Sequence, residues 1–338
     1  MNNVIKSVSI RVPSRLELTL IDLSVGSDRV NGGAGIAISW PLFHCRVSRS
    51  SALEVGGPGF PYTSEVTEFL TNYLDKIACG AVRVDVLESI PVHRGFGSKT
   101  ATLLGVGRAT AELFGATVPT AEIAKLAKRA RTSGVGVNTF DRGGFLIDGG
   151  HPVAPQASGA SDQFVPTRFS SRTTVPSALF SRAFPWPLLV VLPKGVIVEG
   201  QLELDHFRQI CPVPRSSVHE IAYIVCFRMA AAVAEADYRA FCQTVGELQR
   251  AYFKSCELRL QSDEVRHVYE RADAHGIDAI GLSSNGPALY ALSRSPSKAN
   301  AWLRDLRESG VIESYWWTNS PTTGATVRRH RFIERVRP

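Results

Sequence analysis

Hydrophobic and polar residues alternate along several short stretches of the chain, which is the period expected of half-buried β-strands. The clearest stretch covers residues 8–12, and extended character continues over 16–23. Gly32, Gly33 and Gly35 then predict a turn before another strand over 36–40. Later strands are predicted over residues 82–90, 143–148, 187–192, 277–282 and 311–317, and residues 288–292 fit a strand or a helix.

In other segments apolar or small residues recur every three or four positions, as on one face of a helix. These segments are residues 65–77, 98–113, 121–130, 218–235, 237–256 and 297–309, with Thr120 as a candidate N-cap of the third. Residues 154–183 are rich in Ser, Thr, Pro and Arg and show no period, so we expect a connecting loop. This order of elements predicts an α+β protein with two domains, residues 1–183 and 184–338.

Composition narrows the class of protein. The chain has 338 residues, of which 44% are hydrophobic and 20% charged, a mix typical of a globular protein with a substantial core. The net charge of +7 leaves two interpretations, a nucleic-acid-binding protein or an enzyme for a polyanionic small molecule. The basic C-terminal tail, residues 328–338, motivates the first, but no nucleic-acid-binding motif accompanies it, and we therefore expect no nucleic-acid partner.

The sequence predicts a cytoplasmic location. The N-terminal segment has no apolar core typical of a secretory signal. The apolar stretch over 185–198 is interrupted by Pro187, Pro193 and Lys194, which leaves it too short to cross a membrane. The six cysteines form no CxxC pair, which favours reduced thiols over a disulfide or metal site.

The segment PVHRGFGSKTA, residues 91–101, lies between a predicted strand and a predicted helix. Its two glycines permit close approach of a ligand to the backbone, and Ser98, Lys99 and Thr100 open the helix. Unpaired amides at a helix start, beside hydroxyls and an ammonium, can hold an anion. The spacing is neither that of a Walker A loop nor G-x-G-x-x-G. An ordinary glycine-rich turn is the alternative.

The pattern PxxxGFGSxxA resembles the phosphate loop of the GHMP superfamily of small-molecule kinases. A late glycine-rich segment, GLSSNGPA at 281–288, resembles that superfamily's second-domain motif. Its middle motif, S-G-x-D, corresponds to Ser133-Gly134-Val135-Gly136. Gly136 therefore stands where several members carry the aspartate used for phosphoryl transfer, which argues against kinase activity.

A closer resemblance extends from about residue 10 to 320. The segments that carry it are SRLELTLIDL (14–23), RVNGGAG (29–35), SGVGVNTFDRGGFLIDGGH (133–151), CPVP (211–214), EADYRAF (235–241) and SSNGP (283–287). Together they resemble the beta-ribofuranosylaminobenzene 5'-phosphate synthase family. The resemblance implies a GHMP-kinase-like fold with a ribosomal-S5-like N-terminal domain and a ferredoxin-like C-terminal domain, and a homodimer. It also implies transfer of ribose 5-phosphate from phosphoribosyl pyrophosphate (PRPP) to a ring carbon of an aromatic acid, with release of CO₂ and pyrophosphate and with Mg²⁺ as cofactor.

The same resemblance supplies site residues, although it identifies no metal ligands. For PRPP binding they are Arg15, Asp22, Arg29, Gly95, Gly97, Ser98, Lys99, Thr100, Ser283, Ser284 and Gly286. For the acceptor they are His93, Arg94, Arg142 and His151. The candidates for the chemical step itself are Lys99, Arg94 and Asp141.

Two positions depart from the family pattern. Glu17 stands where the family commonly has a histidine, and Lys99 stands in a loop that commonly reads G-S-G-T-Q. An additional ammonium could pair with a second carboxylate. We therefore expect a pyrazole dicarboxylate acceptor, as in relatives that make C-nucleosides of the formycin and pyrazofurin type. The alternatives are a 4-aminobenzoate or 4-hydroxybenzoate acceptor, an ATP-dependent GHMP kinase, or an inactive homologue.

Overall fold

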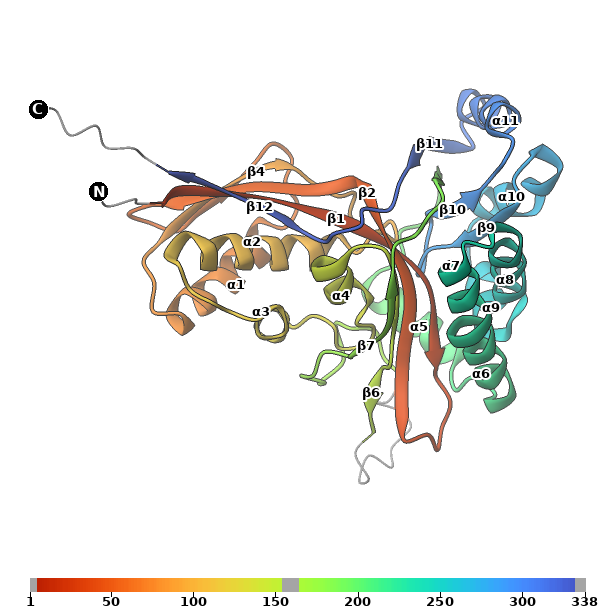
Figure 1. The fold of residues 1–338 in the computed structure, drawn as a ribbon, viewed down its shortest axis with the longest axis horizontal. Coiled ribbons are helices and arrows are strands. Elements are labelled where there is room, and N and C mark those ends of the chain that lie inside the picture. The colour runs from red at the N-terminus through yellow and green to blue at the C-terminus, as the bar shows by residue number, and fades with distance from the viewer. Residues whose placement is uncertain (1–4, 154–163, 332–338) are drawn as a thin grey trace, which may run out of the picture.

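The computed structural model describes residues 5–153 and 164–331, and these residues form two sheets with helices packed on them (Figure 1). The larger sheet has the order β12-β1-β2-β4-β3, with β5 and β6 joined to β2, and β7 to β5. Its strands are β1 (Ile5–Asp22), β2 (Arg29–Arg49), β3 (Glu54–Gly56), β4 (Val82–Glu88), β5 (Phe145–Asp148), β6 (His151–Pro152), β7 (Ala178–Arg182) and β12 (Thr326–Arg331). The smaller sheet has the order β11-β8-β10-β9, formed by β8 (Leu188–Pro193), β9 (Ala279–Leu282), β10 (Leu289–Leu292) and β11 (Ile312–Thr318). The α+β class is confirmed.

The first two strands are long and pair along nearly their whole length. The turn predicted at Gly32–Gly35 is wrong, because these glycines lie within β2 and pair with β1. Their small size serves packing instead. A Cβ at Gly35 would lie 2.4 Å from Cγ1 of Val135, so the absence of a side chain lets the helix that begins at Val135 approach the strand.

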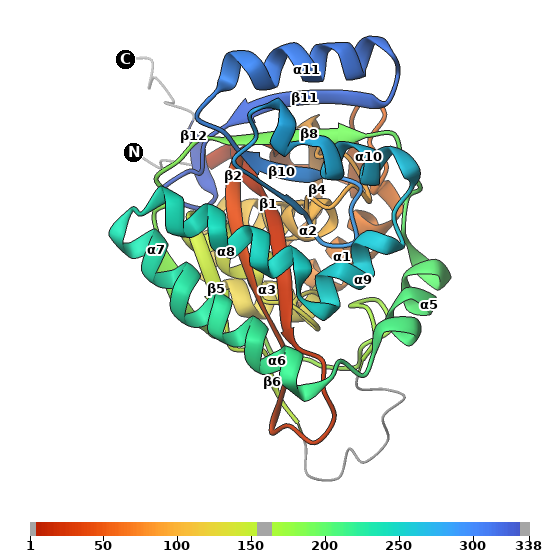
Figure 2. The same ribbon diagram turned by 90° about the vertical axis from the view of Figure 1, so that its right-hand side faces the viewer.

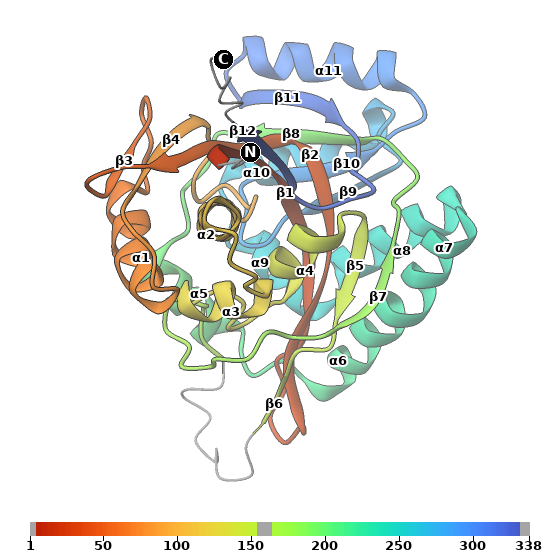
Figure 3. The same cartoon turned by 60° about the vertical axis from the view of Figure 1, so that its left-hand side comes forward.

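Four helices belong to the first domain: α1 (Thr63–Lys76), α2 (Ser98–Phe114), α3 (Thr120–Leu126) and α4 (Val135–Arg142). Figure 3 shows α1, α2 and α3 gathered beside the upper part of the sheet. α2 packs on β1 and β2, and most of its residues are buried. α3 ends four residues earlier than predicted. Lys128 and Ala130, beyond its end, have positive φ angles, so the chain turns there and does not continue as a helix.

The second domain contains more helices than predicted. They are α5 (Gly200–Ile210), α6 (Arg215–Ala222), the π-helical η2 (Tyr223–Met229), α7 (Ala230–Glu235), α8 (Tyr238–Arg250), α9 (Tyr252–Arg259), α10 (Asp263–Arg271), the 3₁₀ turn η3 (Asp273–His275) and α11 (Pro296–Glu308). The helix predicted over 237–256 is divided at Ala251, and α5 and α10 were not predicted. Figure 2 shows α6, α7 and α8 lying across the lower part of β1, β2 and β5.

The continuous helical run Arg215–Glu235 is long and apolar enough to cross a membrane by length and composition alone. About half of its most apolar window is buried inside the protein. Ile221, Val225 and Met229 are fully buried on that side. This is the pattern of a core helix that packs against a sheet.

Two predictions about connections are wrong. The end of the chain is not a detached tail of the second domain, because β12 returns to the first sheet and pairs antiparallel with β1 (Figure 1). Residues 326–331 therefore belong to the first domain's sheet, where Arg329 forms an ion pair with Glu112 of α2. The segment predicted as a loop over 154–183 contains β7, while residues 154–163 and 332–338 lie outside the described part.

Candidate active site

A cavity of about 660 Å³ lies between the two domains. The first domain lines it with β1, the segment 93–100 and the segment 126–133, and the second domain with α5, α9 and the turn 284–286. Arg15, His93, Gly95, Gly97, Ser98, Lys99, Thr100, Ser284 and Gly286, predicted from the sequence, all line this cavity. The structure thus brings together the glycine-rich loop and the late glycine-rich motif.

The glycine-rich loop leads directly into α2. Gly97, the residue before the helix, has a left-handed backbone with φ of 70°, which glycine adopts without strain. A Cβ there would lie 3.0 Å from Nε of Arg15. No side chain caps the start of α2 among the described residues. The first amides of this 17-residue helix are therefore available to an anion at the cavity wall.

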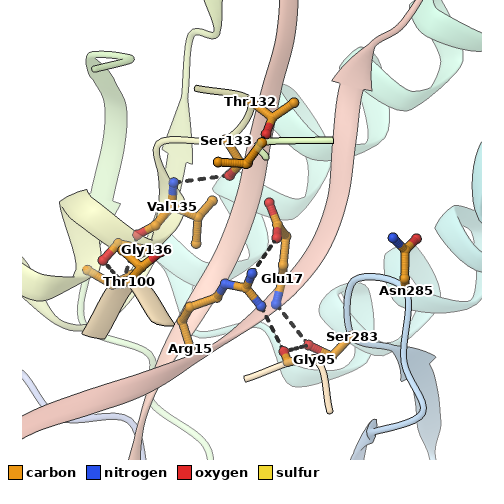
Figure 4. A network of polar contacts seen from close by, with 12 residues as sticks. Arg15, Glu17, Gly95, Thr100, Thr132, Ser133, Val135, Gly136, Ser283 and Asn285 are labelled. Atoms are coloured by element: carbon orange, nitrogen blue, oxygen red, sulfur yellow. Dashed lines mark hydrogen bonds and ion pairs between the residues drawn. The ribbon is translucent and has the colours of Figure 1, made fainter. Parts of the chain in front are cut away.

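Ser283 joins the second domain to this loop. Its hydroxyl donates to the carbonyl of Gly95 at 2.7 Å and accepts from the amide of Glu17 at 3.0 Å. Arg15 donates to the same Gly95 carbonyl at 2.7 Å and pairs with the Glu17 carboxylate at 2.8 Å. Figure 4 shows this network, which holds β1, the loop and the late motif together. Ser283 is fully buried and lies behind the cavity wall.

Lys99 is not a free cation. Its ammonium lies 2.9 Å from the carboxylate of Glu65 and 5.3 Å from the centre of the Tyr62 ring. The Tyr62 hydroxyl in turn lies 2.8 Å from the hydroxyl of Ser98. The charge of Lys99 is therefore held in place, and partly neutralised, at the cavity wall.

Arg129 is a cavity residue that the sequence did not reveal. Its Nε donates to the hydroxyl of Thr100 at 3.0 Å. Burial lowers the pKa of the guanidinium to about 10, so that it remains charged at neutral pH. Sequence periodicity placed residue 129 on a helix, whereas the turn after α3 directs its side chain inward. The basic run from Lys125 to Arg131 is the available signal, but it also fits an exposed helical face.

Another part of the cavity lining, the acidic wall, carries carboxyl groups. Glu17 of β1, Glu203 of α5 and Glu257 of α9 line the cavity. Burial raises the pKa of Glu203 to about 7, and burial also raises that of Glu257, which lies 2.6 Å from the buried ammonium of Lys254. The cavity therefore has a cationic side near the start of α2 and an acidic side formed largely by the second domain.

Besides Ser283, six predicted site residues do not line the cavity; they are Asp22, Arg29, Arg94, Asp141, Arg142 and His151. Asp22 accepts from Ser24, and Arg29 donates to the carbonyls of Gly149 and Gly150. Both lie at the hairpin end of the β1–β2 pair, where Asp22 is two residues beyond Leu20, the last β1 residue that lines the cavity. Neither side chain lines the cavity, and their assignment to PRPP stays a prediction.

The other four residues have contacts elsewhere in the protein. Arg94 pairs with Glu313 of β11 at 2.9 Å, and Asp141 accepts from the hydroxyl of Thr120 at 2.6 Å. Asp141 and Arg142 are exposed at the end of α4. His151 is buried, lies 3.0 Å from Thr174, and has a pKa lowered by burial to about 4. None of these four side chains lines the cavity.

The residues present offer no preformed metal site. Among residues 5–153 and 164–331, no group of three or more His, Cys, Asp or Glu side chains is arranged to hold a metal ion. Mg²⁺ needs few protein ligands, because it retains several waters and binds substrate phosphates. The lack of such a group among the described residues therefore does not bear on magnesium bound through a ligand's phosphates.

The chain is similar to known proteins over nearly its whole length. The family model described as GHMP kinases N terminal domain matches residues 62–144, and that described as GHMP kinases C terminal matches residues 229–312. Beta-ribofuranosylphenol 5'-phosphate synthase from Archaeoglobus fulgidus is 33% identical over 327 residues, which cover 96% of this chain and 98% of that one. The protein of the same name from Methanocaldococcus jannaschii is 33% identical over 83% of this chain and 88% of its own.

Solved structures show the same fold. Homoserine kinase from Cytophaga hutchinsonii has a TM-score of 0.65 at 15% identity, covering 96% of this chain and 98% of that one. A putative sugar kinase from Campylobacter jejuni has a TM-score of 0.69 at 16% identity, covering 97% and 100%. Gly136, which stands at the aspartate position of the S-G-x-D motif, lines the cavity. A Cβ at this position would lie 3.3 Å from Cγ2 of Thr100.

Proposed function

Because this chain belongs to the family of beta-ribofuranosylphenol 5'-phosphate synthases, within the GHMP superfamily, we propose that it transfers ribose 5-phosphate from PRPP to a ring carbon of an aromatic carboxylic acid. CO₂ and pyrophosphate leave, and a C-riboside 5'-phosphate forms. The observation that carries this proposal is the cationic side of the cavity, where the open start of α2, Lys99 and Arg129 adjoin the carboxylate-free position 136.

The reaction needs stabilisation of a leaving group. The bond from the anomeric carbon to pyrophosphate oxygen breaks, and both electrons remain on pyrophosphate. The amides at the start of α2 and the cations of Lys99 and Arg129 meet that developing charge. Groups fixed before the reaction stabilise such charge without reorganisation. When Mg²⁺ is bound to the pyrophosphate, it supplies further charge neutralisation.

The acceptor step needs no general base. The ring carbon that bears the carboxylate forms the new bond to the anomeric carbon. The bond from that ring carbon to the carboxylate then breaks, and its electrons restore the aromatic ring as CO₂ departs. No proton is exchanged, which is consistent with glycine at position 136 and with the exposed position of Asp141.

The proposed reaction can use several aromatic acids, so the acceptor has to be argued separately. A pyrazole dicarboxylate was expected because Lys99 could pair with a second carboxylate, but Lys99 is already paired with Glu65. The relatives named above carry a phenol in their names, which supports 4-hydroxybenzoate as the acceptor. A 4-aminobenzoate and an aminopyrazole dicarboxylate are the acceptors to compare with it.

The decisive experiment incubates the protein with PRPP, Mg²⁺ and these three acids, and follows pyrophosphate release and product mass. We expect a product that contains the ribose 5-phosphate group and lacks CO₂. Release of ADP from ATP, without pyrophosphate release from PRPP, would instead identify a kinase. Light scattering after size-exclusion chromatography tests the expected homodimer.

The loop assignment has its own test. Lys99→Ala should lower the rate of pyrophosphate release by at least tenfold. Lys128→Ala is the matched control, because Lys128 is another lysine that lines the cavity. Its side chain is 66% exposed, and its ammonium lies 3.7 Å from the Glu68 carboxylate, farther than the 2.9 Å between Lys99 and Glu65. Equal effects of the two substitutions would contradict a specific role of Lys99.

A further inference from the structure

The acidic wall of the cavity also carries aromatic side chains. On α5, Glu203 and Phe207 both line the cavity, and on α9 Phe253 and Glu257 do the same. Residues four apart lie on one face of a helix, so each helix presents one carboxylate and one phenyl ring to the cavity. Glu17 of β1 completes this wall.

One carboxylate oxygen on this wall has no partner. Oε2 of Glu17 pairs with Arg15 at 2.8 Å, whereas Oε1 is buried and forms no hydrogen bond within the described part of the chain. The Glu17 side chain is only 9% exposed. Figure 4 shows its carboxyl group pointing away from Ser283 and toward the side of Ser133, which also lines the cavity. A buried carboxylate oxygen without a hydrogen bond is costly unless a water or a ligand supplies the donor.

The chemistry of this wall restricts what can lie against it. This wall carries three carboxyl groups, two of them paired with Arg15 and Lys254, whereas phosphate groups are attracted to the cationic side at the start of α2. The phenyl rings favour a flat apolar ring over a sugar. The raised pKa of Glu203 leaves it partly protonated at neutral pH, which reduces repulsion of an aromatic acid. The wall therefore suits the end of an aromatic ring that carries an O–H or N–H group.

Resting on the proposed function, we propose that Glu17 determines acceptor specificity, its free oxygen accepting a hydrogen bond from a hydroxyl or amino substituent on the acceptor ring. This contact distinguishes acceptors that can donate from those that cannot. A hydrogen bond to a charged group corresponds to a change of about 10- to 100-fold in affinity. The ring substituent, and not the ribose hydroxyls of the donor, is the group recognised.

Calorimetry tests this without requiring turnover. Binding of 4-hydroxybenzoate and 4-aminobenzoate is compared with binding of their O-methyl and N,N-dimethyl forms, with ribose 5-phosphate and pyrophosphate present. We expect the wild type to prefer the hydrogen-bond donors by about tenfold or more. Glu17→Gln should abolish or reverse this preference, because its amide N–H₂ can face the ring while its carbonyl accepts from Arg15.

Two further variants make the result specific. Glu17→Asp keeps the charge but withdraws the oxygen by one methylene, and should lose the same preference even if Glu17→Gln fails to fold. Glu68→Gln removes one negative charge from an exposed position that also lines the cavity, and should keep the wild-type preference.

Three outcomes would overturn the inference: an unchanged preference in the folded Glu17 variants, no binding of any of the four acids to the wild type, or weaker PRPP binding with the acceptor preference intact. The last would assign Glu17 to the ribose hydroxyls. Failure of the proposed function has a different signature, since it leaves PRPP uncleaved with every acceptor while the binding preference can still be measured.

Discussion

Replacing Ser283 by alanine tests whether the contact between the two domains at the cavity is energetically important. The substitution removes one hydroxyl with two hydrogen bonds, one donated to Gly95 and one accepted from the amide of Glu17. The Gly95 carbonyl still accepts a hydrogen bond from Arg15. Losing the bond from Ser283 to this carbonyl therefore costs about 1 kcal/mol, the net contribution of one hydrogen bond. The amide of Glu17 is left buried without a partner, which costs a further 1–3 kcal/mol, roughly.

We therefore expect Ser283→Ala to lower the free energy of unfolding by about 2–4 kcal/mol. Urea unfolding followed by circular dichroism measures this change, with the slope of the transition checked for two-state behaviour. The KM for PRPP should rise as well, because the loop at Gly95 loses its attachment to the second domain. The wild-type protein under the same buffer and salt conditions is the reference.

Ser284→Ala is the control for stability. Ser284 is the neighbouring residue, and its hydroxyl forms no hydrogen bond to the described residues, so this substitution should change the free energy of unfolding by less than about 0.5 kcal/mol. A Ser283→Ala variant as stable as Ser284→Ala would refute the energetic role given to the Ser283 network.

Three further predictions concern the cavity. Burial raises the pKa of Glu203 from 4.5 to about 7. Its contribution to the free energy of unfolding is therefore present below pH 4.5 and is lost as the pH rises through about 7. Glu203→Gln should make the fall in the free energy of unfolding between these pH values smaller by about 3 kcal/mol. Gly97→Ala places a side chain at φ of 70° and 3.0 Å from Arg15, and should raise the KM for PRPP more than it lowers kcat. Gly136→Asp introduces a carboxylate beside Thr100, and should weaken PRPP binding at least tenfold in calorimetry without producing ADP from ATP.

The phosphate loop could be predicted from sequence because its signal is local. Two glycines, a strand before them and a helix after them all lie within residues 82–113. The structure places that loop in the cavity and α2 directly after it. The late motif at 281–288 was recognised in the same way, although its contact with Gly95 depends on the packing of the two domains.

The acidic wall could not be predicted in this way. Glu203 and Glu257 lie on separate helices, α5 and α9, and each looks in the sequence like an ordinary polar residue of an amphipathic helix. Their proximity to Glu17 arises only when the two domains pack together around the cavity. Asp22 shows the reverse case, since it adjoins motif residues in sequence but lies on β1 just beyond Leu20, the last residue of that strand to line the cavity.

The distribution of charge, and not its total, favours the enzyme over the nucleic-acid-binding protein, the two interpretations left open by the net charge of +7. Arg328, Arg329 and Arg331 lie on the edge strand β12, and Arg329 is paired with Glu112. Arg15, Lys99 and Arg129 instead line one cavity, each held by a partner before any ligand binds. A cluster of cations fixed in this way suits a small polyanion whose charge grows at one place during the reaction. A nucleic acid would instead require cations spread along an exposed surface, whereas Arg129 is only partly exposed and lines the cavity.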